Sequence, residues 1–116
     1  MSLRSTPECQ HVIVNSSAGG TLAVVAAVSG LSVAIYRMIL TVATTDTVTV
    51  QDTSGGTLSQ PFAFGASGGS ITLDTPINGD PWWVSATNLG IQLNSTAMVQ
   101  VSADIWYLQQ VGVTVG

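Results

Sequence analysis

The sequence predicts an all-β protein, a jelly-roll-like antiparallel β-sandwich of about eight strands. Three observations favour this fold. Short segments alternate polar and apolar residues, which is the period-two pattern of a strand with one buried face. Turn signals rich in Gly, Asn and Ser recur at short, regular intervals, as in sandwiches and barrels. Strong helix formers are sparse, whereas Thr, Ser, Val and Gly are abundant.

The length of 116 residues corresponds to one domain. The polar segment 1–10 is expected to form an N-terminal arm, and residues 11–116 a single β-sandwich domain. Neither a linker nor an internal repeat divides the chain.

The first two strands are expected near 11–15 and 21–27, on either side of the glycine-containing turn Ser16–Gly20. The second belongs to the longest apolar run, Leu22–Val28, which the pair Ser29-Gly30 ends. This run is far shorter than the roughly 20 apolar residues of a transmembrane helix, so no membrane partner is expected.

The third strand, expected near 32–43, is apolar on both faces. Strict alternation places Val33, Ile35 and Ile39 on one face and Ala34, Tyr36, Met38, Leu40 and Val42 on the other. This pattern fits a strand that is covered by its own core and by a neighbouring subunit. Tyr36, Arg37 and Met38 are therefore candidate interface residues.

Arg37 interrupts the first of these two faces. One interpretation is that it lies near a bulge and reaches solvent. The other is that it pairs with Asp46, Asp52 or Asp104, because an unpaired buried charge is costly.

Clear alternation in three later segments predicts half-buried strands near 46–52, 70–74 and 90–94. Further strands are expected near 58–64, 82–87 and 98–109. The last of these also has apolar residues at helical spacing, but its alternation from Val99 to Ile105 and its β-branched content favour a strand.

Charge is scarce in this chain. Charged residues make up 7% of it, against about a quarter in ordinary soluble domains. A surface with so little charge is typical of a protein covered by neighbours, so a homo-oligomer is expected. With 2 Lys+Arg and a net charge of −4, the chain lacks the cations that bind phosphates, and no nucleic-acid partner is expected.

Titratable groups that could support catalysis are also few. Cys9 and His11 are the single residues of their types, and a structural zinc site needs about four ligands. The aspartates mostly adjoin turns, where their side chains bond the local backbone. We therefore assign no catalytic, cofactor-binding or metal-ligating residues, and we expect neither a cofactor nor an enzyme.

The most distinctive local feature is the pair Trp82-Trp83. Neighbouring strand residues point to opposite faces, so one ring should enter the core and the other should face outwards. Trp106 begins a second aromatic pair. These three tryptophans are candidate interface residues, while stacking on a sugar beside Asp80 and Asn88 is the alternative.

The order of these motifs resembles a group of small tailed-phage virion proteins found among head genes. The resemblance extends from about Ser16 to Tyr107. The motifs that carry it are Leu22–Gly30, Ile39-Leu40, Thr47–Val50, Gly55–Leu58, Phe62–Phe64, Gly68-Gly69, Trp82-Trp83, Gly90–Leu93 and Val99–Val101.

This resemblance implies a jelly roll or similar sandwich that oligomerises on the outer capsid surface, often as a trimer. Such virion proteins decorate or cement the shell by contacting the major capsid protein, and no catalytic residues accompany the resemblance. Two alternatives stay open. The domain could be a tail or fibre component whose loops 65–69 and 78–81 contact a host receptor, or a free carbohydrate-binding module.

Overall fold

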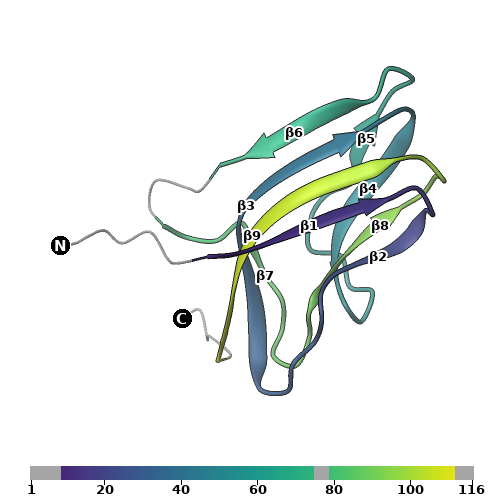
Figure 1. Ribbon diagram of the computed structural model, residues 1–116. Coiled ribbons are helices and arrows are strands. Elements are labelled where there is room, and N and C mark those ends of the chain that lie inside the picture. Colours follow the sequence, from purple (N-terminus) through teal and green to yellow (C-terminus); the bar gives the residue numbers. More distant parts are fainter. Residues whose placement is uncertain (1–8, 75–78, 112–116) are drawn as a thin grey trace.

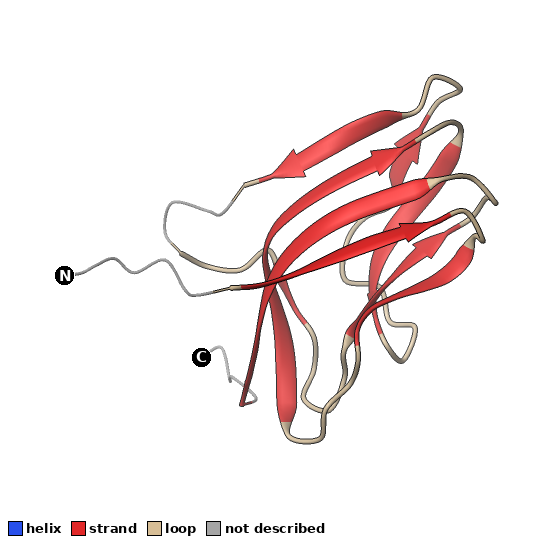
Figure 2. Ribbon diagram, in the orientation of Figure 1, coloured by secondary structure: helices blue, strands red, loops and turns tan. Residues whose placement is uncertain are grey.

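The computed structural model describes residues 9–74 and 79–111. Within these residues the protein contains strands and no helix (Figure 2). The strands are β1 (Gln10–Ser16), β2 (Gly20–Val25), β3 (Leu31–Val42), β4 (Asp46–Asp52), β5 (Phe62–Phe64), β6 (Gly69–Leu73), β7 (Trp83–Val84), β8 (Ile91–Ser95) and β9 (Val101–Val111). The described residues therefore contain no helix of the length and hydropathy needed to cross a membrane.

Two antiparallel sheets pack face to face as a sandwich (Figure 1). The first sheet has the order β1-β9-β3-β6, with the short β7 also pairing with β3, and the second has the order β2-β8-β4-β5. Apart from β7, this is the strand arrangement of an eight-stranded jelly roll. The predicted fold class is confirmed. The predicted arm falls largely in residues 1–8, outside the described residues, and β1 begins at Gln10.

The core lies between the two sheets and consists of the inward-facing side chains of both. Its fully buried members are aliphatic, and each contributes about 1.5–3 kcal/mol by leaving water. The largest of them are Ile35, Met38, Leu40, Ile91, Leu93, Ile105, Val33, Val42, Val48, Val50 and Val101. Alternation along β4, β8 and β9 therefore agrees with the burial that the sequence predicts.

A bulge at Tyr36 changes which side chains of β3 enter the core. Ile35 pairs with Tyr107 and Arg37 with Trp106, so Tyr36 is an extra residue opposite β9. The bulge exchanges the two faces, and the core takes Val33 and Ile35 before it but Met38, Leu40 and Val42 after it. The predicted division of this strand into two faces was wrong for this reason.

The first half of β3, from Ser32 to Tyr36, is buried on both faces within the chain itself. Ala34 and Tyr36 point away from the core cluster but are 0% and 7% exposed. The segment 82–88 runs along this half, because the amides of Trp82, Ser85 and Asn88 donate to the carbonyls of Ile35, Val33 and Leu31. Much of the double coverage predicted for this strand is therefore intramolecular.

Two predicted strands are shorter than expected. Regular pairing of β5 starts only at Phe62, because Pro61 has no amide hydrogen to donate to a ladder. Before it, the amides of Leu58 and Ser59 both donate to the carbonyl of Val50. The predicted strand 82–87 keeps ladder geometry only at Trp83–Val84.

Candidate interaction surface

The outer face of the first sheet carries a row of four side chains, three from neighbouring strands and one from the residue that follows a fourth strand. Trp106 of β9 pairs in register with His11 of β1 on one side and with Arg37 of β3 on the other. Asp74, directly after β6, lies beside Arg37. We call these four residues the outer row.

The tryptophan of the outer row is stacked from two sides. The rings of His11 and Trp106 are nearly parallel, with 13° between their planes and 4.4 Å between their centroids. The Arg37 Cζ atom lies 4.5 Å from the centroid of the same indole. Since β1 and β3 flank β9, the two groups approach the ring from opposite sides, and the cation over the ring face adds electrostatic attraction.

Charges on this face are paired within the chain. Arg37 Nε donates to Asp74 Oδ1 at 3.2 Å, and His11 Nε2 lies 2.9 Å from Asp104 Oδ1. The expectation that Arg37 lies near a bulge is confirmed, and its side chain is 37% exposed. Asp74 replaces the three aspartates proposed as its partners, because the β3–β6 pairing places Asp74 beside it.

The adjacent row of the same face is apolar at two of its positions. Ile13 of β1 and Ile39 of β3 both pair in register with Asp104 of β9. Ile13 is 67% exposed, whereas Ile39 is half-buried. The outer row, these two isoleucines and Asp104 together form the surface that we call the contact face.

The candidate interface residues fall in three places. Trp106 and Arg37 lie on the contact face, half-buried. Met38 is fully buried in the core, and Tyr36, which points away from the core, is 7% exposed. Neither presents appreciable surface to a partner. The two remaining candidates, Trp82 and Trp83, lie at the edge of the sandwich.

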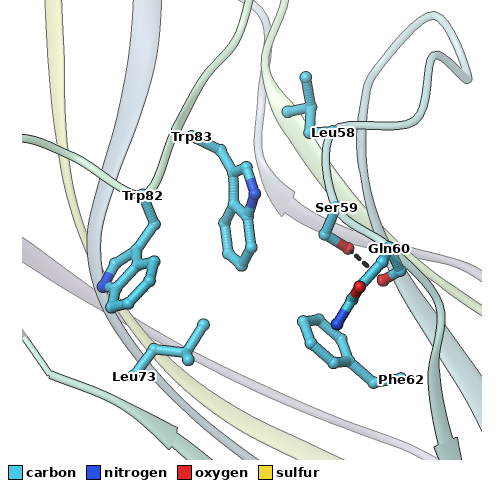
Figure 3. A pocket seen from close by; sticks show the side chains of 7 residues that line it. All are labelled: Leu58, Ser59, Gln60, Phe62, Leu73, Trp82 and Trp83. Carbon is cyan, nitrogen blue, oxygen red and sulfur yellow. Dashed lines mark hydrogen bonds between the residues drawn. The ribbon is translucent and has the colours of Figure 1, made fainter.

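The side chains of Trp82 and Trp83 point to different sides, as their adjacency in the sequence predicts. Trp83 packs against the core, and Trp82 is exposed, which confirms the expectation of one ring inwards and one outwards. Both nevertheless line one pocket at the edge between the sheets (Figure 3). Sequence reasoning missed this pocket because its other walls come from the 58–62 segment and Leu73, which only the packing of the sheets brings together.

The surroundings of Cys9, Tyr36 and Asp52 shift the pKa values of these three groups. Burial raises the pKa of the Cys9 thiol. Burial, followed by the influence of Cys9 and Asp80, raises the pKa of Tyr36. Hydrogen bonding by Ser54, together with backbone amides of the same turn, lowers the pKa of Asp52 despite some desolvation. Within the described ranges, no group of three or more His, Cys, Asp or Glu side chains is arranged to hold a metal ion.

Searches against protein-family models, curated proteins and solved structures returned no match to this chain.

Proposed function

We propose that this chain is a virion structural protein that decorates the outer surface of a phage capsid and stabilises the head through oligomeric protein–protein contacts. The observation that carries the proposal is the contact face. An exposed isoleucine there lies beside a tryptophan that neighbouring side chains hold in one orientation. Trp and Arg are the residues most enriched among the energetically dominant positions of interfaces.

The charge pattern of the contact face supports a role in assembly. Its two acidic groups already have partners from the same chain, so an incoming surface need not supply counter-charges. Arginine is enriched at protein interfaces, and pairing within the chain lowers the cost of covering the two carboxylates.

The proposed mechanism is mass action. Many copies that bind the assembled shell, and not its dissociated subunits, shift the equilibrium towards the intact particle. The partners in this proposal are further copies of the chain, with a trimer expected, and the major capsid protein.

A charge placed at Ile13 tests the contact face. Ile13→Asp should reduce the mass of the oligomer measured by light scattering, because a second carboxylate would be covered by the partner beside Asp104. Met98→Asp is the matched control, since Met98 is 81% exposed and lies in the turn before β9. Met98→Asp should leave the mass unchanged. A strict monomer at high concentration for the unsubstituted protein would contradict self-association.

The cementing role is tested on particles. Heads stripped of the protein should lose resistance to heat and to low ionic strength, and adding the protein back should restore it. The Ile13→Asp variant should restore less than the Met98→Asp variant. Stripped heads that are as resistant as intact ones would refute the decoration role.

A further inference from the structure

We propose that the pocket at the edge of the sandwich is a binding site for a neutral sugar ring. The pocket adjoins the contact face, because Trp82 donates to the Asp74 carbonyl, but the two share no residue. The proposed ligand is independent of the proposed virion function. Its lining comes from the segment before β5, from β5 and β6, and from the start of β7. The lining residues are Leu58, Ser59, Gln60, Phe62, Leu73, Trp82 and Trp83.

The size of the pocket suits a small ligand. Its volume of about 340 Å³ lies at the lower end of the range of about 300–1,000 Å³ for ligand pockets. Figure 3 shows the Trp82 ring at one end, the Gln60 side chain at the other and the Trp83 ring between them. This space favours a monosaccharide unit, free or at the end of a glycan.

Aromatic rings provide the stacking surfaces of the pocket. The centroids of Trp82 and Trp83 are 6.3 Å apart at an angle of 42°, and Phe62 meets Trp83 edge-on at 6.4 Å. Trp82 Nε1 donates to the carbonyl oxygen of Asp74 at 2.9 Å, which fixes the orientation of this exposed ring. A ring that is oriented before binding loses little conformational entropy when a ligand stacks on it.

Two polar groups of the pocket have no hydrogen-bond partner within the described part of the chain. They are the indole N–H of Trp83 and the side-chain amide of Gln60. Ser59 differs, because its hydroxyl accepts from the Val50 amide at 2.9 Å and donates to the Gln60 carbonyl at 2.8 Å. The free N–H can donate, and the free amide can both donate and accept, as sugar hydroxyls require.

This combination favours a neutral sugar over other ligands. A pyranose has an apolar C–H face for the indoles and hydroxyls at its rim for Trp83 and Gln60. None of the seven lining residues is charged, so nothing in the lining compensates the carboxylate of an acidic sugar. An apolar side chain of a protein partner would cover the rings but leave both polar groups unpaired.

The test is a titration of the full chain, followed in ¹H–¹⁵N NMR spectra, with methyl glycosides of glucose, galactose and N-acetylglucosamine. At least one should produce saturable shifts of the Trp83 indole N–H and the Gln60 amide signals. The Trp106 indole N–H, on the contact face, should not shift. N-acetylneuraminic acid should cause no comparable change.

Three variants separate ligand stacking from general effects. Trp82→Ala should weaken binding about 5- to 10-fold, because the exposed ring supplies stacking but little core packing. Gln60→Ala should weaken it about 3- to 10-fold. Trp106→Ala, the control, should leave it unchanged.

Two kinds of result would overturn the assignment. The first is that no glycoside shifts the Trp83 signal, or that Trp82→Ala binds the sugar as well as the unsubstituted protein does. The second is that N-acetylprolinamide or N-acetylphenylalaninamide shifts these signals while every sugar leaves them in place. That outcome would assign the pocket to a partner's side chain instead.

Discussion

Asp46 links the start of β4 to the turn between β8 and β9. Asp46 is 3% exposed, and its carboxylate accepts bonds from the Ser95 hydroxyl at 2.5 Å and from the Ala97 amide at 2.9 Å. The Thr47 amide and the Thr96 hydroxyl complete the set at 2.7 Å and 3.1 Å. Burial is the largest single influence and would raise the pKa, but the four donors together outweigh it and lower the pKa of Asp46.

A depressed pKa in the folded protein has a defined effect on acid stability. The ionised Asp46 stabilises the fold above its ordinary pKa of 3.8, and this contribution is lost as the pH falls through the lower folded value. We expect Asp46→Asn to lower the free energy of unfolding at pH 7 by about 1–3 kcal/mol, because one acceptor oxygen becomes a donor. Denaturant unfolding measured between neutral pH and about pH 2 checks both effects.

Asp74→Asn is the matched control for this prediction. The Asp74 side chain is 77% exposed and pairs only across the surface with Arg37, so its loss should cost less than about 1 kcal/mol. The Asp46→Asn variant should lose less free energy of unfolding at low pH than the unsubstituted protein does. Some loss should remain, because the pKa of Asp52 is also lowered. Equal stability losses for the two variants would contradict the role given to the buried site.

At the scale of elements, polar–apolar alternation predicts the buried faces of β4 and β8 but not the buried face of β3. The alternation in β4 and β8 identifies their buried faces directly, since neither strand contains an irregularity in its pairing with the other. In β3 the same rule fails after Tyr36, because a bulge that depends on pairing with β9 exchanges the two faces. Its local sign is Arg37 on an apolar face, which indicates a nearby bulge but not where the faces exchange. The Arg37–Asp74 contact was missed for a related reason, since only the order of strands in the sheet places Asp74 there.

The turn that leads into β8 requires glycine at position 90. A Cβ atom there would lie 2.0 Å from the carbonyl oxygen of Val25 and 2.7 Å from the carbonyl carbon of Ala26, both of which are backbone atoms. We expect Gly90→Ala to destabilise the protein by about 2–3 kcal/mol, because the β2 end of the second sheet must shift. Thermal unfolding monitored by circular dichroism measures the loss.

Gly65→Ala provides the comparison. Nothing lies within 4 Å of a Cβ atom at Gly65, so this variant should unfold within about 0.5 kcal/mol of the unsubstituted protein. A Gly90→Ala variant as stable as Gly65→Ala would show that the close approach of the two backbones is relaxed in solution.

At the scale of the whole molecule, the distribution of charge predicts how assembly responds to salt. In the contact face Ile13 and Ile39 flank Asp104, and both acidic side chains have a partner in the same chain. The partner is Arg37 for Asp74 and His11 for Asp104. If the proposed assembly uses this face, attraction between charges of different subunits contributes little to it. The oligomer mass should therefore stay constant when the ionic strength rises from about 0.05 to 0.5 M.

Light scattering over this range of salt checks the prediction. Mass that falls steeply with added salt would indicate that opposite charges on different subunits hold the oligomer together. That result would contradict the closed pairs of the contact face, because Arg37 is one of two cationic Lys or Arg side chains in the sequence and would then have to bond an acidic group of another subunit.

The position of β9 has a consequence for how the protein reaches its fold. β9 is the last strand described, yet it lies between β1 and β3 in the middle of its sheet. A ribosome-bound chain has therefore made β1 and β3 well before the strand that joins them emerges. Until then both present unpaired edges, which are templates for aggregation. We expect slow folding, limited by this late insertion between distant segments.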